Sequence, residues 1–390
     1  MWQKPRLDWW LLTSIFGLLV FGLLMVWSAT QYVPPPRPQG GEAVEGLAVS
    51  VAGSRALRQA AWAALALTLM MLLKQLDYRR LNHPAFALGG MAVAMCLLGV
   101  VYLADRGNHR FLRLGLLGLQ PSELAKPALV IFLAHFIAQH GRRLNEARTL
   151  IAPAVILTAV VAAVTAADLG TGVVLAVTAA VMLWLAGLEW RYFGLGGLVA
   201  LVLLALAVWL FPYRLVRIIA FVDPQLKIVT ALGLREPVEK QLAKSRAARD
   251  ADYQQRQALV ALGSGGWRGL GLMQGEHKFG FLPEAHNDFI YAVVGEETGL
   301  IGCAGVLAAF VVILLRGLRL ANRALEDFGR YLALGVTTMV VFQALLNMSV
   351  VLKLLPTKGI SLPMVSYGGS SLVATMILFG MLLSVSDRSI

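Results

Sequence analysis

Long apolar runs separated by short polar segments dominate this chain. A transmembrane α-helix needs about 20 consecutive, mostly apolar residues. Runs of this kind lie near residues 9–28, 56–73, 85–104, 121–139, 149–167, 171–188, 192–211, 289–315, 331–352 and 369–386. Only Asp168-Leu169-Gly170 separates the fifth run from the sixth, which predicts a tight re-entry. The pattern predicts an all-α integral membrane protein with about ten transmembrane helices, built as a single polytopic domain over residues 1–390.

Composition excludes a soluble fold. Hydrophobic residues make up 58% of the chain, charged residues only 14%, and the mean hydropathy is +0.70. Soluble domains are about half apolar and about a quarter charged. The first run, Trp9 to Trp27, exceeds the apolar core of an ordinary signal peptide, so we expect no cleavage there. Cys96 and Cys303 both lie inside apolar runs and are expected to be free thiols.

The basic residues predict the orientation, because short loops rich in Lys and Arg stay in the cytoplasm. Four basic clusters fall on one side of a ten-helix arrangement: Lys4 and Arg6; Lys74, Arg79 and Arg80; Arg142, Arg143 and Arg148; and Arg316, Arg319, Arg323 and Arg330. This side is predicted to be cytoplasmic, with both termini. The net charge of +12 therefore reflects topology, and no basic patch interleaved with aromatic residues supports a nucleic-acid site.

The opposite side carries three loops. Residues 29–55 are rich in proline and glycine and predict a flexible connector. Residues 212–288 form one large extracytoplasmic loop, which does not contradict the orientation because long loops translocate largely regardless of charge. The short 105–120 loop does break the rule, since it carries Arg110 and Arg113 among its basic residues. Binding of an anion is the leading explanation.

Two segments of the large loop have recognisable patterns. Residues 236–262 predict a charged amphipathic helix that lies on the membrane surface or against the protein body, in a structural role. Residues 263–271 are glycine-rich, but they follow no predicted strand, so a dinucleotide site is disfavoured. Irregular backbone beside a ligand is the better interpretation.

Ionisable residues inside spans are costly, so each one is a candidate functional residue. Glu123 and Lys126 stand three apart in the first turn of the fourth span, behind Pro121, and can form an ion pair. The pair either joins helices structurally or lines a polar cavity open to the outer side. Asp168 can cap the sixth helix or line the same cavity.

Further polar residues lie in the eighth and ninth spans. Glu296 and Glu297 are adjacent on a helix and point about 100° apart, so at most one can face a given cavity. Gln343 and Asn347, one turn apart, fit interhelical hydrogen bonds as well as ligand contacts.

The densest polar cluster lies where the large loop re-enters the membrane, at Phe281 to Phe289. It contains His286 and Asp288. A carboxylate at this boundary can accept a proton from a hydroxyl group. It fits the N-cap of the eighth span equally well.

Five motifs carry a family resemblance, and they stand in family order. They are Gln120-Pro121-Ser122-Glu123-Leu124-Ala125-Lys126; Asp168-Leu169-Gly170-Thr171; Leu282-Pro283-Glu284-Ala285-His286-Asn287-Asp288-Phe289; Gly295-Glu296-Glu297-Thr298-Gly299; and Leu362-Pro363-Met364-Val365-Ser366-Tyr367-Gly368-Gly369-Ser370-Ser371. Together they resemble the SEDS proteins (shape, elongation, division and sporulation), represented by RodA and FtsW. The resemblance runs from about Asp8 to the C-terminal residues.

The resemblance implies a ten-helix peptidoglycan glycosyltransferase of the bacterial inner membrane. Its substrate would be lipid II, a disaccharide-peptide on undecaprenyl pyrophosphate. Its partners would be a class B penicillin-binding protein acting as transpeptidase and other divisome or elongasome membrane proteins.

The resemblance also implies roles for individual residues. Asp288 would be the essential carboxylate, with Glu123 and Lys126 in the same outward-facing cavity. We expect Asp168, His286 and Glu297 to contribute to substrate binding. Cations are needed for the developing pyrophosphate charge, and the candidates are Arg110, Arg113, Lys126, Arg214 and Arg217. A divalent cation, Mg²⁺ or Mn²⁺, could share that work, although no ligand spacing demonstrates a metal site.

The chain departs from the family pattern at several positions. Ala166-Ala167 replace the usual Gln-Pro before Asp168, and Asn287 stands where Thr is commoner. Leu355-Pro356-Thr357-Lys358-Gly359 resembles the division members more than the elongation members. Two other functions remain open at this point: a flippase that moves lipid II across the bilayer, which would also use buried charges, and a structural division scaffold.

Overall fold

A computed structural model describes residues 8–30, 45–104, 112–114, 117–210, 246–279, 282–356 and 359–388. Within these residues, ten helices follow the ten predicted runs: α1 (Trp9–Thr30), α2 (Glu45–Gln75), α3 (Pro84–Ala104), α4 (Pro121–His140), α5 (Ala147–Ala167), α6 (Leu169–Leu185), α7 (Trp190–Leu210), α12 (Ile290–Arg323), α13 (Asp327–Val351) and α14 (Gly369–Arg388). A further helix, α11 (Arg246–Gly265), belongs to the large loop. Two 3₁₀ turns, η1 (Tyr78–Leu81) and η2 (Gly141–Arg143), and the strands β1 (Leu112–Leu114) and β2 (Leu117–Leu119) complete the elements.

The predicted fold class is confirmed. Eight described helices are long and apolar enough to cross a membrane. Two shorter apolar segments are α6 (Leu169–Leu185) and the part Trp190–Val202 of α7. The chain is therefore a multi-pass membrane protein. The small antiparallel sheet formed by β1 and β2, which pairs Arg113 with Gly118, was not predicted from the sequence.

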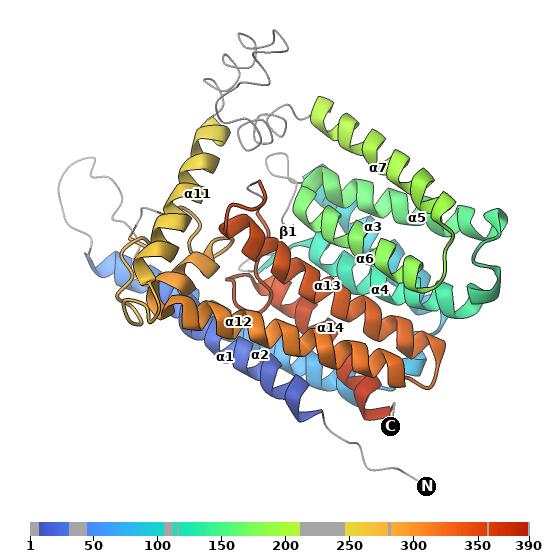
Figure 1. The fold of residues 1–390 in the computed structure, drawn as a ribbon, viewed down its shortest axis with the longest axis horizontal. Helices are drawn as coiled ribbons and strands as arrows, with labels where there is room; N and C mark the ends of the chain where they lie inside the picture. The colour runs from blue at the N-terminus through green and yellow to red at the C-terminus, as the bar shows by residue number, and fades with distance from the viewer. Residues whose placement is uncertain are drawn as a thin grey trace.

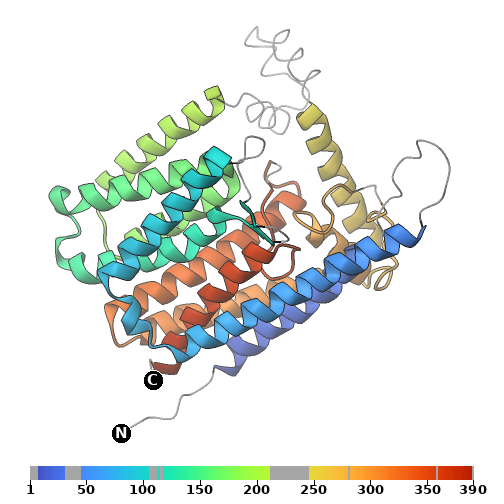
Figure 2. The same cartoon turned by 180° about the vertical axis from the view of Figure 1, so that it is seen from behind.

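The two ends of the bundle differ. The start of α1 and the end of α14 lie at one end, whereas α11 and the start of α12 lie at the other (Figures 1 and 2). Consecutive spanning helices run in alternating directions between these ends. The described part of the large loop is therefore opposite to the ends of the chain, as the ten-crossing topology requires. Which end faces the cytoplasm stays a prediction.

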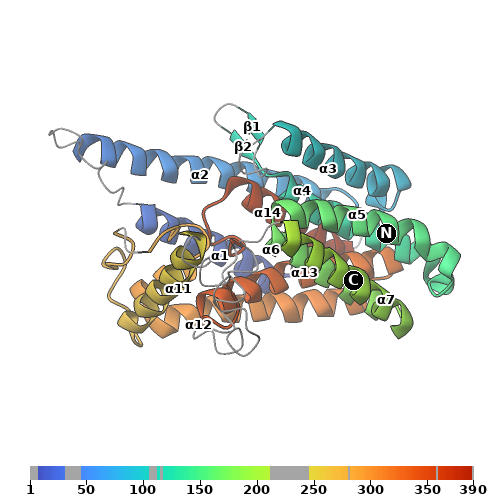
Figure 3. The same cartoon turned by 90° about the horizontal axis from the view of Figure 1, so that it is seen from above.

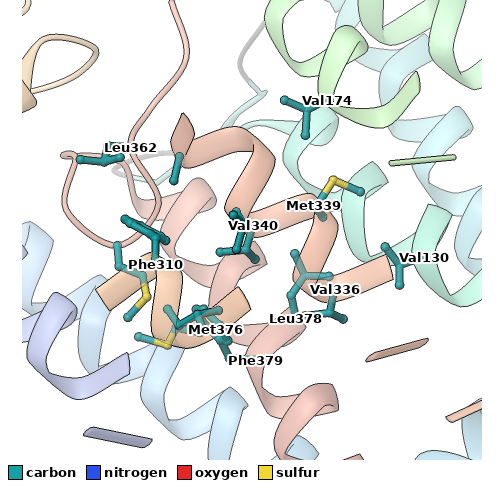
Figure 4. Packing of buried hydrophobic residues seen from close by; sticks show 14 of the residues in the cluster. Val130, Val174, Phe310, Val336, Met339, Val340, Leu362, Met376, Leu378 and Phe379 are labelled. Carbon is teal, nitrogen blue, oxygen red and sulfur yellow. The ribbon is translucent and has the colours of Figure 1, made fainter. Parts of the chain in front are cut away.

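Three helices form the centre of the bundle. In an 18-residue apolar stretch of each helix, 78% of the residues are buried in α4, 78% in α13 and 83% in α14, compared with 11% in α5. Side chains of α4, α6, α12, α13 and α14 meet around Val336 and Val340 of α13 (Figure 4). Helices in a bilayer associate through such packing, because lipid offers no hydrophobic driving force between them. The central helix α13 is therefore packed on most of its surface by other helices of the bundle.

Asp168 caps α6. Its Oδ1 accepts hydrogen bonds from the backbone N–H groups of Gly170 (3.0 Å) and Thr171 (3.3 Å), and its Oδ2 accepts one from Thr171 Oγ1 (3.2 Å). The capping role considered from the sequence is thus confirmed. A Cβ at Gly170 would collide with the side chain of Ile360, so this turn packs directly against the segment that precedes α14.

The glycine-rich segment after α11 is clamped onto α12. At Gly299 the α12 backbone leaves helical geometry (φ 67°, ψ −165°). The carbonyls of Glu296 and Glu297 accept hydrogen bonds from Leu270 N (2.9 Å) and Gly271 N (3.0 Å), and Leu300 N donates to Gly266 O (2.9 Å). The glycine-rich segment therefore has the predicted irregular backbone. In the structure this backbone contacts α12, which lies beside α11 (Figure 3).

The helix before this segment differs in its bounds from the prediction. α11 begins at Arg246 and ends at Gly265, and predicted helix residues 236–245 lie outside the described part of the chain. Ala258 and Ala261 are buried, and Gln255 Nε2 donates to Leu355 O (2.9 Å). The helix therefore packs against the protein body, one of the two predicted placements.

Candidate active site

The segment that carries Asp288 is held at three consecutive carbonyl oxygens. Those of His286, Asn287 and Asp288 accept hydrogen bonds from Tyr367 N (2.9 Å), Ser366 Oγ (2.7 Å) and Asn347 Nδ2 (2.8 Å), respectively. The N-cap of α12 is Phe289, and no side chain caps the helix from that position. Asp288 stands one residue before the cap, so the alternative role of Asp288 as the N-cap residue is not supported.

Residues 359–368 contact both α13 and the Asp288 segment. Asn347 Nδ2 also donates to Ile360 O (2.7 Å), and Gln343 Nε2 donates to Ser361 O (2.9 Å). Within the segment, Leu362 N donates to Ser366 Oγ (2.7 Å). Gln343 and Asn347 therefore act as interhelical and loop-binding groups, which is the first of the two roles considered from the sequence.

Glu123 and Lys126 form the predicted ion pair, and it is buried. Lys126 Nζ lies 2.7 Å and 2.8 Å from the two carboxylate oxygens of Glu123, and it donates to Gln343 Oε1 at 2.7 Å. The two residues are 4% (Glu123) and 2% (Lys126) exposed. An ammonium group has three N–H donors, so all three have partners inside the protein. Any anion that approaches Lys126 must replace one of them.

The site thus joins two motifs that are far apart in sequence. Gln343 binds Lys126 of α4, and Asn347, one turn further along α13, binds the backbone of Asp288. Residues four apart on a helix have Cβ atoms about 6 Å apart. The predicted base and the predicted cation are therefore attached to neighbouring positions of one rigid helix.

The short sheet approaches the same region. Gln120 N donates to Ser370 Oγ (3.1 Å), and Ser370 Oγ donates to Gly118 O (2.9 Å), so the end of β2 is attached to the start of α14. This places the backbone of Arg113 beside the region of the Ser370 motif. The side chain of Arg113, and the whole of Arg110, Arg214 and Arg217, lie outside the described residues, and their predicted roles stay predictions.

His286 lies in the re-entry segment. Burial, reinforced by the charge of Arg55, lowers its pKa below the ordinary histidine value, against an opposing effect of Glu284. Its ring meets Tyr367 edge-on, with 5.6 Å between centroids. At neutral pH the imidazole is therefore uncharged, so in this structure it offers no positive charge to a pyrophosphate.

Glu296 and Glu297 both accept hydrogen bonds from the segment 273–278. Glu297 accepts from Lys278 Nζ (2.7 Å) and from Ser28 Oγ of α1 (2.6 Å), and the side chains of Lys278 and Glu297 are almost completely buried. Glu296 Oε1 accepts from His277 Nδ1 (2.8 Å). These contacts give both carboxylates a structural role, and the predicted substrate contact of Glu297 stays a prediction.

Sequence patterns missed two members of this group. Lys278 lies in the loop and Ser28 at the end of α1, about 250 residues away. Only the fold brings them together. Between the described residues there is also no group of three or more His, Cys, Asp or Glu side chains that could hold a metal ion.

The family comparison agrees with this arrangement. The family model FTSW_RODA_SPOVE, described as "Cell cycle protein", matches residues 9–389. The chain belongs to this family. It is the SEDS family indicated by the five motifs.

Named relatives cover nearly the whole chain. A protein of Geobacter metallireducens named "Probable peptidoglycan glycosyltransferase FtsW" is 36% identical over 99% of this chain and 96% of its own length. "Stage V sporulation protein E" of Bacillus subtilis is 33% identical over 86% of this chain and 87% of its own length.

Solved structures show the same fold. A chain from the structure "Structural coordination of polymerization and crosslinking by a peptidoglycan synthase complex" aligns with a TM-score of 0.73 at 27% identity, covering 98% of both chains. The crystal structure of the rod shape determining protein RodA of Thermus thermophilus aligns with a TM-score of 0.64 at 26% identity, covering 98% of this chain and 97% of RodA.

Proposed function

We propose that this SEDS protein is a peptidoglycan glycosyltransferase that polymerises lipid II into glycan strands, with Asp288 as the general base. The observation that carries the proposal is the attachment of Asp288 to the helix that also binds Lys126. The names of the relatives support the reaction class. The structural neighbour from a peptidoglycan synthase complex supports it as well.

The reaction needs a base and a stabilised leaving group. The 4-hydroxyl of the acceptor sugar transfers its proton to the Asp288 carboxylate as the oxygen attacks the anomeric carbon of the donor. The new glycosidic C–O bond forms while the C–O bond to undecaprenyl pyrophosphate breaks. A positioned base contributes roughly 10²- to 10⁴-fold to such a step.

The leaving pyrophosphate needs positive charge. Lys126 supplies it by exchanging one of its protein partners for a phosphate oxygen, and the arginines of the 105–120 and 212–288 loops add to it. Glu123 holds the Lys126 side chain in place until the substrate binds. Charge-assisted contacts of this kind stabilise the transition state most when they are preorganised.

The same family membership supports a partner and a location. A class B penicillin-binding protein would crosslink the strands, together with other divisome or elongasome membrane proteins. The protein lies in the bacterial inner membrane, with both termini in the cytoplasm and the large loop outside. The basic clusters of the short loops support this orientation.

The test is polymerisation of lipid II by purified protein, alone and with its transpeptidase partner. We expect Asp288→Asn to lower the rate of glycan-chain formation by roughly 10²-fold or more, because an amide does not accept the proton. Glu276→Gln is the matched control, because it removes an exposed carboxylate from the same end of the protein without touching the site. Near wild-type polymerisation by Asp288→Asn would overturn the assignment.

The flippase alternative gives a different result. It predicts translocation of lipid II across liposome membranes without polymer, and it needs no carboxylate at the outer surface. Translocation that survives Asp288→Asn, in the absence of any polymer from the wild-type protein, would favour the flippase.

A further inference from the structure

Asn347 occupies an unusual position between the two segments of the site. It lies on α13, it is 1% exposed, and its Nδ2 group donates to two carbonyl oxygens, those of Asp288 (2.8 Å) and Ile360 (2.7 Å). Both partners are acceptors, so the amide orientation is fixed by chemistry: only the NH₂ group can face them.

The other half of this amide is unused. Asn347 Oδ1 is buried and has no hydrogen-bond partner among the described residues. A buried polar atom without a partner costs stability, and the same amide offsets part of that cost by donating to two carbonyl oxygens that an apolar side chain would leave without this donor. The two N–H donors are therefore what this position gains from an asparagine.

Three donors to consecutive carbonyl oxygens hold the backbone of the Asp288 segment. Two of the three donors to the consecutive carbonyls, Tyr367 N and Ser366 Oγ, come from the 359–368 segment. Asn347 alone of the three lies on a central helix of the bundle. It attaches both the Asp288 segment and the 359–368 segment to that helix.

We propose that Asn347 is a positioning residue that holds the Asp288 carboxylate at its working place, an inference that rests on the proposed function. Reactive groups must be held within about 0.5 Å of their productive position. A displacement of about 1 Å can cost 10²-fold in rate. Asn347 acts through the backbone of Asp288 and need not touch the substrate.

The test compares Asn347→Leu, which keeps the approximate size and removes both donors, with Thr337→Val. Thr337 is buried on the same helix, and its Oγ1 donates to Ala333 O (2.7 Å), so the control also loses one buried hydrogen bond. It lies ten residues, about 15 Å, from Asn347 along α13. The measurements are kcat and KM for lipid II polymerisation and the thermal midpoint of each purified protein.

We expect Asn347→Leu to lower kcat about 10- to 100-fold and to change KM less than about 3-fold. Thr337→Val should keep the wild-type kcat. The double-mutant cycle with Asp288→Glu, which moves the carboxylate by one methylene, should be non-additive, because the two residues act on one geometry. Asn347→Leu should then cost less in the Asp288→Glu background than in the wild type.

The outcomes separate this inference from the proposed function. If Asp288→Asn is inactive but Asn347→Leu keeps the wild-type kcat, the positioning role is overturned and the proposed function stands. If Asp288→Asn is active, both fall. If Asn347→Leu does not fold, Asn347→Ala replaces it, because it removes both donors without adding a branched apolar side chain or a charge. Failure of both variants to fold would assign Asn347 to stability and overturn the proposal.

Discussion

Gln343 and Asn347 lie one turn apart on α13, and they bind the two halves of the candidate active site. Gln343 accepts from Lys126 and donates to Ser361 O, and Asn347 donates to Asp288 O and Ile360 O. Both side chains are almost completely buried. A displacement of α13 would therefore be transmitted to the base and to the cation together. The short 359–368 segment, bound by both residues, would follow the same movement.

Removing one member of the Glu123–Lys126 pair should be more harmful than removing both charges. Glu123→Gln leaves the Lys126 charge in a site where it is 2% exposed. An uncompensated buried charge costs roughly 3–5 kcal/mol. We expect a marked fall in the thermal midpoint of Glu123→Gln, measured in detergent or nanodiscs.

The double variant Glu123→Gln/Lys126→Met is the control for this prediction. It removes both charges and should regain part of the lost stability, because no unpaired ion remains. It should not regain polymerisation, since Lys126 is assigned to the pyrophosphate. A double variant less stable than either single variant would contradict the description of the pair as a buried, mutually compensating unit.

The buried ion pair of Glu297 and Lys278 should stabilise the protein by attaching the 273–278 segment to α12. Glu297→Gln leaves the Lys278 ammonium group unpaired and should lower the thermal midpoint, by the same mechanism and at a similar cost of roughly 3–5 kcal/mol. Ser28→Ala removes one neutral donor to the Glu297 carboxylate and should cost about 1.5–3 kcal/mol.

The kinetic readout decides between the structural role of Glu297 and the predicted substrate contact. If Glu297 is structural, the protein that remains folded should bind lipid II with the wild-type KM. A contact with the substrate would in addition weaken binding of lipid II by the folded Glu297→Gln protein. Loss of one hydrogen bond to a charged group costs about 1.5–3 kcal/mol, so KM should then rise about 10-fold or more.

The spans could be predicted from the sequence because lipid imposes one simple requirement. Backbone polar groups in the hydrocarbon must be satisfied within the segment, so apolar runs of sufficient length become helices. Even the break at Asp168 was readable, because its carboxylate has the local geometry of an N-cap. The Glu123–Lys126 pair followed in the same way from a spacing of three residues.

Contacts that depend on tertiary packing could not be predicted. Nothing around Lys278 or Ser28 indicates that they meet at Glu297, because the two segments are about 250 residues apart. The interruption of α12 at Gly299 was also not predicted, although the polar stretch Gly295-Glu296-Glu297-Thr298-Gly299 breaks the apolar run there, because the contact that fixes it comes from the distant segment after α11. For Asn347, the sequence was compatible with interhelical hydrogen bonding and with a ligand contact. The two roles were distinguished only by the structure, in which Asn347 donates to the carbonyls of Asp288 and Ile360.

The interruption of α12 should tolerate no side chain at Gly299. Its φ of 67° disfavours L-residues, and an added Cβ would collide with the backbone of Trp267 and Gly269. Strain of this kind costs about 1–3 kcal/mol, so Gly299→Ala should lower the thermal midpoint. The collision would also displace the glycine-rich segment. Increased cleavage by a protease at peptide bonds within residues 265–275 would report that displacement.

Gly305→Ala is the matched control in the same helix. A Cβ there meets nothing within 4 Å. Alanine also favours a helix over glycine by about 0.5–1 kcal/mol. Gly305→Ala should therefore be neutral or slightly stabilising. An equal fall in the thermal midpoint of both variants would mean that any substitution in α12 is destabilising. The contact between Gly299 and the glycine-rich segment would then not be the cause.

His286 should make stability fall as the pH decreases. Its pKa in the folded protein lies below the ordinary value, chiefly because of burial and also because of Arg55. In the unfolded chain a histidine takes up a proton near a pH of about 6.5. Below that pH the unfolded state binds more protons than the folded state, so protonation favours unfolding. The contribution is fully present above a pH of about 6.5 and is lost as the pH falls through the folded pKa.

The measurement is the thermal midpoint of the wild type and of His286→Gln between about pH 7.5 and about pH 5, a range that spans the ordinary histidine pKa. Glutamine does not titrate, so the variant lacks this part of the slope, whereas carboxylates elsewhere affect both proteins equally. The wild type should lose more stability than the variant over this range. Parallel curves would mean that the ring near Tyr367 and Glu284 takes up its proton as readily in the folded protein as in the unfolded chain.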